Sequence, residues 1–313
     1  GKNVLLKDGF QVETTLETDR QEAARAALHK GVSELGRRQG FEGPVQHLAP
    51  GQFEPFLERA RRLYGGPESL EEDYIYYGLV TSVERRKALV KIGGLDAELL
   101  LKGGANWAKA YVADSRKNDG RIRDLRPALK VGDVVMVSRR TEKKPSDRPR
   151  LKLRQVPPVQ GALISMAHRS GYVSSVVGGY DFDQSEYNRA FQGCRQPGSI
   201  FKPLVYGLAL DTDLTLASPL EDTPITVYDS KAGYLWKPGN YGGDYRGHVL
   251  LRNAFIKSMN IPAIRVIRHV GTAEAVKWSE MLGVTTPLYP DQSLVLGSSC
   301  VYPWDMLKVY GTF

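Results

Sequence analysis

Short apolar runs separated by turn residues fill the middle of the 313-residue chain, and they constrain the fold more than any other feature. Residues 74–81, 87–92, 95–101 and 129–138 have the length and the β-branched and aromatic content of strands. The Gly93-Gly94 pair suits a tight turn between the second run and the third. Several short strands, one long loop and a return strand predict a small all-β barrel of the oligonucleotide/oligosaccharide-binding (OB) kind.

Helical patterns lie on both sides of this predicted barrel. Residues 18–40 place apolar side chains at helical spacing, and residues 53–63 form a short amphipathic segment. From residue 157 onward, two apolar runs joined by a turn at Gly171 predict a β-hairpin. Helices are expected to start near Ser199, Asn260 and Thr272. Strands followed by helices predict an α/β (α+β) domain in which helices cover an antiparallel sheet.

Composition excludes few functions. A formal net charge of +8, with Lys and Arg scattered along the chain, favours acidic partners such as nucleic acid, anionic lipid or an anionic polymer. No run of eighteen apolar residues and no signal peptide is present, and the first residue is Gly1 rather than Met. The start is therefore expected to be a cleavage point or a cloning boundary.

The cysteines and histidines predict no metal centre and no cofactor. Cys194 and Cys300 make neither a metal cluster nor a disulfide framework, and the five histidines lack metal-ligand spacing. Each cysteine is expected to be a buried thiol, and a bond between the two stays open as an alternative.

Ser199 and Lys202 are the first candidates for chemistry. Their spacing puts both side chains on one face at the start of an apolar helix, where Gly198 permits close backbone approach. A lysine that accepts the serine proton must be neutral, so its pKa must fall by roughly three units, or about 4 kcal/mol. Burial or a neighbouring cation such as Lys257 can achieve this. A serine three residues before a lysine also arises by chance.

The segment Ser258-Met259-Asn260 lies in a predicted turn before another helix. Without chemistry, Asn260 would be the helix N-cap and Ser258 a turn residue. With chemistry, a hydroxyl and a carboxamide would relay a proton and hold a substrate amide beside the serine–lysine pair.

Longer motifs carry a resemblance to a known family. They are Gly178-Gly179-Tyr180-Asp181-Phe182, Phe191-Gln192, Arg195-Gln196-Pro197-Gly198-Ser199-Ile200-Phe201-Lys202-Pro203, Asn240-Tyr241-Gly242-Gly243, Ser258-Met259-Asn260-Ile261-Pro262-Ala263 and Leu296-Gly297-Ser298-Ser299. With Thr14-Thr15-Leu16 and Gln21, these motifs resemble the class A penicillin-binding proteins of the 1A type over nearly the whole chain.

The resemblance implies a peptidoglycan D,D-transpeptidase. By position, Ser199 would be the acylated nucleophile and Lys202 its general base. Ser258 would pass the proton to the leaving amine, Asn260 would hold the acyl-donor amide, and the Ser199 amide would supply half of an oxyanion hole. The implied partners are D-alanyl-D-alanine stem peptides, β-lactam antibiotics, and cell-wall or envelope proteins that meet the barrel.

The resemblance also implies a division of the chain. Residues 1–71 would be a linker and the start of the transpeptidase region, 72–156 an OB-like insert, and 157–313 the transpeptidase domain. The family's Lys-Thr-Gly strand and its glycan-polymerising domain are absent from the sequence, so we expect this polypeptide to be impaired in acylation. Its parent would be periplasmic (extracytoplasmic) and anchored in the inner membrane.

Two rival functions remain. A β-lactam hydrolase shares the serine–lysine pair, although the inserted barrel favours transfer. A non-catalytic binding module for nucleic acid or cell-wall polymer would use basic and aromatic residues of the barrel, with steep salt dependence. We favour a solvated surface and expect no nucleic acid there. The residues of that surface are Lys102, Trp107, Lys109, Tyr111, Arg116, Lys117, Arg121 and Arg123.

Overall fold

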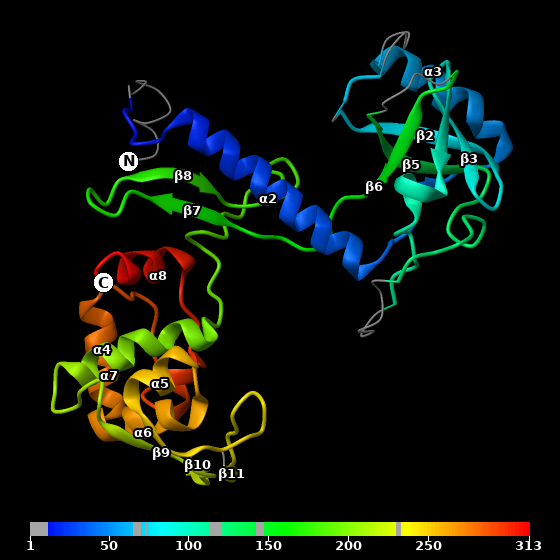
Figure 1. Ribbon diagram of the computed structural model, residues 1–313. Coiled ribbons are helices and arrows are strands. Elements are labelled where there is room, and N and C mark those ends of the chain that lie inside the picture. The colour runs from blue at the N-terminus through cyan, green and yellow to red at the C-terminus, as the bar shows by residue number, and fades with distance from the viewer. Residues whose placement is uncertain (1–11, 65–69, 73, 113–119, 142–146, 230–232) are drawn as a thin grey trace. The chain divides into compact units, whose positions relative to one another are not determined.

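The computed structural model describes residues 12–64, 70–72, 74–112, 120–141, 147–229 and 233–313 (Figure 1). The chain divides into two compact units. One unit comprises residues 26–160, and the other comprises residues 1–25 together with 161–313. Helix α2 (Thr18–Gln39) contributes residues to both units.

A closed barrel forms the body of the first unit, as its short strands predicted. The sheet runs in the order β1-β5-β2-β3-β4-β6, and an additional β5–β6 pairing closes a five-strand ring. All pairings in the ring are antiparallel except β4 with β6. The strands are β1 (Gln46–His47), β2 (Tyr76–Val83), β3 (Lys87–Ile92), β4 (Leu95–Leu100), β5 (Asp133–Arg139) and β6 (Arg150–Arg154).

Apolar side chains from every strand of the ring fill its interior, and Val80, Leu99, Val137 and Leu153 are fully buried. Two short helical turns, η1 (Pro50–Gln52) and η2 (Leu101–Ala105), lie in the connections. Helix α3 (Phe53–Tyr64) buries Phe56, Leu57 and Ala60 as its amphipathic pattern predicted. The compact unit is therefore wider than the expected range 72–156, because α3 and β1 pack on the barrel.

Strand β6 is a finding that the sequence did not predict. It begins at Arg150, the last residue of the stretch 139–150, whose charge suggests an exposed loop. Its sequence alternates basic residues with Leu151 and Leu153, and both leucines are 0% exposed. Apolar residues do recur at every second position, as in a strand with one buried face, but the arginine and lysine residues between them made the segment look like a charged loop.

In the second unit, the predicted hairpin forms from β7 (Leu163–Met166) and β8 (Val173–Val177). Gly171 has φ +70° in its turn, as expected. The start of α2 binds along β8, where the Gln21 side chain donates to the Val176 carbonyl and accepts from the Val176 amide, both at 2.8 Å. Figure 1 shows α2 beside this hairpin.

Helices make up most of the rest of the second unit, and buried aliphatic residues of α4 and α6 form its core. The strands pair only two by two among the described residues of 161–313, so the expected helix-covered sheet consists here of separate antiparallel pairs. The elements are η3 (Gly198–Phe201), α4 (Lys202–Leu210), β9 (Pro219–Asp222), β10 (Val227–Asp229), β11 (Tyr234–Trp236), β12 (Gly247–Leu250), α5 (Leu251–Ile256), α6 (Asn260–Val270), α7 (Thr272–Met281), η4 (Gln292–Leu296) and α8 (Pro303–Tyr310).

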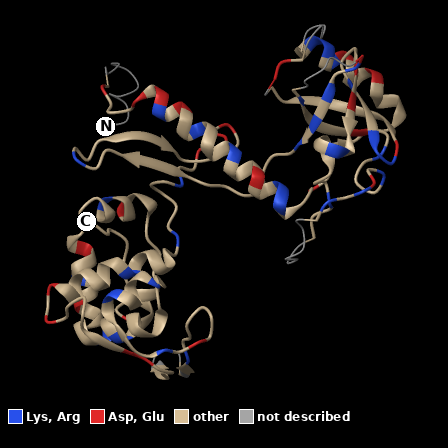
Figure 2. Cartoon of the chain, viewed as in Figure 1, with Lys and Arg blue, Asp and Glu red and all other residues tan. Residues whose placement is uncertain are grey.

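Charges are spread over both units rather than gathered in one segment (Figure 2). None of the described helices is long and apolar enough to cross a membrane. Within the described ranges, no group of three or more His, Cys, Asp or Glu side chains could hold a metal ion. Arg116 and Lys117, which belong to the rival binding surface, lie outside the described residues.

Candidate active site

Ser199 lies in the 3-10 turn η3, directly before helix α4. Its side chain is exposed, and its carbonyl accepts a hydrogen bond from the backbone amide of Lys202. Gly198 has φ +61°, a conformation that side chains disfavour, so glycine is needed at this position. The turn therefore presents the Ser199 hydroxyl to solvent at the start of a helix whose other face is buried.

Lys202 is the first residue of α4, and it is 2% exposed. Its Nζ atom donates to the Ser258 carbonyl at 2.6 Å, to Ser258 Oγ at 3.1 Å and to Asn260 Oδ1 at 2.8 Å. Burial lowers the pKa of Lys202 to about 8, because a charged amine loses hydration inside the protein. Burial alone accounts for this shift, so the charge of Lys257 is not needed.

The connection between α5 and α6 holds Ser258 in an unusual conformation. Ser258 has φ +50° and is the only described non-glycine residue with positive φ. Such a conformation costs on the order of 1–3 kcal/mol and is often found at functional sites. It lets the carbonyl and the hydroxyl of Ser258 both accept hydrogen bonds from the amine of Lys202.

Asn260 is the first residue of α6 and not its N-cap, which is Met259. The Asn260 side chain donates to the Gly239 carbonyl at 2.9 Å while its oxygen accepts from Lys202. The helix start is satisfied instead by Asn240, whose Oδ1 accepts from the amides of Asn260 at 3.0 Å and Ile261 at 3.2 Å.

Asp222 supports this arrangement from the interior. It is 0% exposed, and its carboxylate accepts from Asn240 Nδ2 at 2.7 Å and from the Arg246 amide at 2.9 Å. Asn240 belongs to one of the motifs noted in the sequence, but no role was predicted for it. Asp222 had no sequence signal, because nothing local to residue 222 indicates a partner eighteen residues later.

The segment before Ser199 is fixed to the loop after η4. Arg195 and Val301 exchange backbone hydrogen bonds at 3.0 and 2.9 Å, and Gln196 donates to the Ser298 carbonyl at 3.1 Å. Cys194 and Cys300 form a disulfide with their Cα atoms 5.4 Å apart. The expectation of two buried thiols was therefore wrong, since the paired loops bring cysteines 106 residues apart within bonding distance.

The structure thus brings Lys202, Ser258 and Asn260 into one hydrogen-bonded cluster. Ser199 lies three residues from Lys202, but no hydrogen bond joins their side chains in the described part of the chain. The amine turns inward to Ser258 and Asn260, while the hydroxyl faces solvent. An exposed hydroxyl beside a buried amine of lowered pKa is suited to nucleophilic catalysis on a carbonyl group.

Comparison with known proteins finds two family models. The penicillin-binding protein OB-like domain matches residues 41–159, and the penicillin binding protein transpeptidase domain matches residues 161–294. The first match covers the barrel unit, and the second covers all four candidate site residues.

Whole-chain relatives agree with these matches. The chain is 32% identical to penicillin-binding protein 1A of Pseudomonas aeruginosa over 98% of its length and 30% identical to that of Escherichia coli over 97%. It spans 36% and 35% of the length of these relatives. A solved structure of penicillin-binding protein 1A from Haemophilus influenzae has the same fold, with a TM-score of 0.77 and 24% identity over 99% of this chain and 44% of that one.

Proposed function

Since this chain belongs to the penicillin-binding proteins that join an OB-like domain to a transpeptidase domain, we propose that it carries out D,D-transpeptidation through an acyl-enzyme on Ser199. The donor would be a peptidoglycan stem peptide ending in D-Ala-D-Ala, and the acceptor an amine on a second stem. β-Lactams would acylate the same serine. One observation carries the proposal: the buried Lys202 amine contacts both Ser258 and Asn260 one helical turn from Ser199.

In the first half of the reaction, Lys202 would take the Ser199 proton as Ser199 Oγ attacks the carbonyl carbon between the two D-alanines. Burial keeps the pKa of Lys202 at about 8, so about a tenth of the amine is neutral at pH 7. The amide of Ser199 would donate to the developing oxyanion. The carbon–nitrogen bond then breaks, and D-alanine leaves with a proton passed from Lys202 through Ser258.

In the second half, the acceptor amine would enter where D-alanine departed and attack the ester carbonyl. Ser258 and Lys202 would take the proton that the amine loses, and the Ser199 oxygen would recover a proton as it leaves. Asn260 would hold the donor amide throughout, because its side chain is fixed by Gly239 and Lys202. The Asn240–Asp222 pair would keep Asn260 in place without touching the substrate.

The disulfide supports a location outside the cytoplasm. Disulfides persist in oxidising compartments such as the periplasm and are rare in the cytosol. Cys194 and Cys300 are bonded to each other, and Cys300 is exposed. We propose an extracytoplasmic site of action, where peptidoglycan is assembled.

An assay of D-alanine release tests the proposal. The complete gene product that contains this sequence is incubated with a D-Ala-D-Ala peptide, with and without an amine acceptor, and products are resolved by mass. We expect D-alanine release and a transfer product that grows with acceptor concentration, and neither in Ser199→Ala. Hydrolysed donor alone, at any acceptor concentration, would favour a hydrolase. Release that persists in Ser199→Ala would refute Ser199 as the nucleophile.

A further inference from the structure

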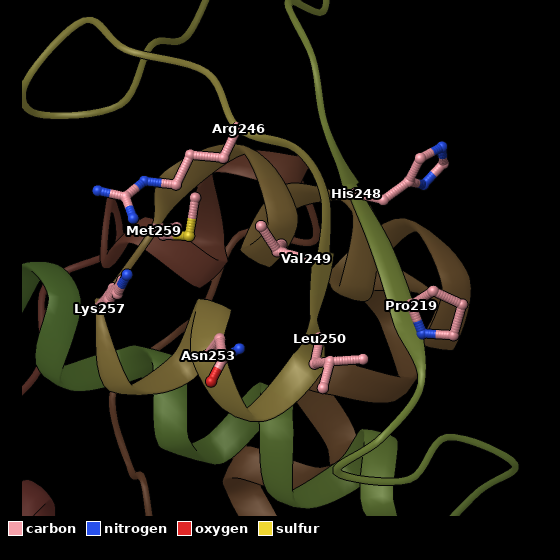
Figure 3. A pocket seen from close by; sticks show the side chains of 8 residues that line it. All are labelled: Pro219, Arg246, His248, Val249, Leu250, Asn253, Lys257 and Met259. Carbon is pink, nitrogen blue, oxygen red and sulfur yellow. The ribbon is translucent and has the colours of Figure 1, made fainter.

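A pocket of about 360 Å³ adjoins the Ser258 turn in the second unit. Arg246 and Lys257 lie on one side of it in Figure 3, and His248 and Pro219 lie on the other. Val249, Leu250 and Met259 add apolar wall, and Asn253 adds an amide. The pocket therefore combines two basic side chains, Arg246 and Lys257, with a surface that can pack against methylene groups.

Three basic residues line this pocket: Arg246, His248 and Lys257. In the part of the chain that the structure describes, no carboxylate lies within 4.0 Å of any of them, so none forms an ion pair. The carboxylates nearest in the sequence either bind other groups or are exposed to solvent. Asp222 accepts from Asn240 and from the backbone of Arg246, and Glu221 pairs with Arg265 at 3.0 Å. Asp244 is exposed on the loop before Arg246. The uncompensated charge makes an anion the suited ligand.

The pocket and the candidate active site share the Ser258 turn and the hydrogen bonds of the buried Asp222 carboxylate. Lys257 and Met259 flank Ser258 in the chain, and both line the pocket. On the same side of the pocket, the Arg246 amide donates to the buried Asp222 carboxylate that holds Asn240, which in turn holds Asn260. The pocket is thus held in a defined position relative to Ser258 and Asn260.

The position of Ser258 in the proposed reaction indicates which substrate would occupy the pocket. Ser258 passes a proton to the departing amine, and the accepting amine must enter from the same side. Groups attached to the acceptor close to that amine would then reach the residues that flank Ser258. We infer that the Arg246–Lys257 pocket binds a carboxylate of the acceptor peptide, an inference that rests on the proposed function.

A pair of matched acceptors tests this assignment. The complete gene product is given a D-Ala-D-Ala donor and either glycyl-glutamate amide or glycyl-glutamine amide, which differ only in the side-chain carboxylate. We expect kcat/KM for the glutamate acceptor to be about tenfold higher, equivalent to 1.4 kcal/mol. In Arg246→Gln/Lys257→Gln the ratio should fall to about one. In Arg252→Gln, an exposed arginine on α5 outside the pocket, the preference should persist.

A salt titration of the wild-type protein provides a test that needs no variant. The preference for the glutamate acceptor should shrink as salt rises from about 0.05 to 1 M, because exposed charge pairs are screened. Equal use of the two acceptors at low salt, or a preference that survives in the double variant, would overturn the pocket assignment. Penicillin labelling of the wild type distinguishes failure of the pocket assignment from failure of the proposed function. A protein that penicillin does not label would overturn the proposed function itself.

Discussion

The backbones of Gly198 and Gly297 are in direct contact, so that a Cβ atom placed on Gly297 would lie 2.3 Å from the Gly198 nitrogen. Gly198 directly precedes the candidate nucleophile, and Gly297 ends η4 with φ +72°. This contact and the nearby Cys194–Cys300 disulfide hold the backbone segment that precedes Ser199. The loop that holds it lies about a hundred residues later in the chain.

Gly297→Ala should disturb the nucleophile turn. The methyl group must displace the backbone of Gly198, and alanine also disfavours φ +72°. We expect a loss of about 1–3 kcal/mol in the free energy of unfolding and a lower rate of penicillin labelling. Gly171→Ala is the matched control, because Gly171 has φ +70° but nothing within 4 Å of its Cβ. Equal effects of the two substitutions would show that the contact is unimportant.

The pH dependence of acylation should reflect Lys202. In the proposed mechanism the neutral amine of Lys202 is the base, and burial lowers its pKa to about 8. The rate constant for penicillin acylation should therefore fall about tenfold for each pH unit below 8 and level off above it. Rates are measured by stopped-flow labelling between pH 5.5 and 9.5. A rate that is independent of pH across 6–9 would contradict a general-base role for Lys202.

The lowered pKa of Lys202 should also make the free energy of unfolding depend on pH in the alkaline range. The folded-state pKa of Lys202 lies below its unfolded value of 10.5, so the folded state binds fewer protons between about pH 8 and 10.5. Stability relative to Lys202→Met should rise over that window by about 3 kcal/mol and stay constant below it. Urea unfolding of both proteins at pH 7 and pH 10 measures the difference, and an unchanged difference would contradict the lowered pKa.

Removing the Asp222–Asn240 pair should impair the site without touching the substrate. Asp222→Asn places an amide donor against one of its two partners, Asn240 Nδ2 or the Arg246 amide, which should cost about 1–3 kcal/mol of stability. Asn240→Ala exposes the first amides of α6 and should cost about 1 kcal/mol. Both should slow penicillin acylation. The two substitutions remove the same contact, so the double variant should lose less activity and stability than the two single variants added together. Losses that add strictly would argue against coupling between Asp222 and Asn240.

Reducing the Cys194–Cys300 bond should loosen the segment before Ser199. We expect a loss of about 2–4 kcal/mol of stability on reduction and slower acylation by penicillin. Cys194→Ser/Cys300→Ser should reproduce both effects and be insensitive to reductant. Melting temperatures with and without dithiothreitol, together with intact mass under non-reducing conditions, provide the measurement. An unchanged melting temperature on complete reduction would contradict this role.

The parts of the fold that were predictable depend on local patterns. The barrel strands, α3 and the hairpin at Gly171 all have periodic apolar residues bounded by turn residues. Ser199, Lys202, Ser258 and Asn260 were predicted as site residues because they lie in short motifs with a chemical rationale, and the structure brings Lys202, Ser258 and Asn260 into contact. Strand β6 was missed because its leucines alternate with arginine and lysine.

The interactions that escaped prediction join residues distant in sequence. Asp222 reaches Asn240, and Asn240 reaches Asn260 across twenty residues, without any periodicity that marks them. The Cys194–Cys300 bond depends on two loops whose pairing is decided by the packing of η3 and η4. Burial of Lys202, which lowers its pKa, likewise depends on helices that follow it in the chain.

The most direct test of the account is to locate the penicillin adduct. The complete gene product is incubated with a penicillin for several hours, its intact mass is recorded, and the modified peptide is sequenced. Ser199→Ala is treated in the same way, as is the control Ser218→Ala, whose hydroxyl contacts Thr215 outside the candidate site. We predict a single adduct on Ser199, absent from Ser199→Ala and retained in Ser218→Ala. No adduct on the wild type, or an adduct that remains in Ser199→Ala, would contradict the assignment of Ser199, Lys202, Ser258 and Asn260 as an acyl-transfer site.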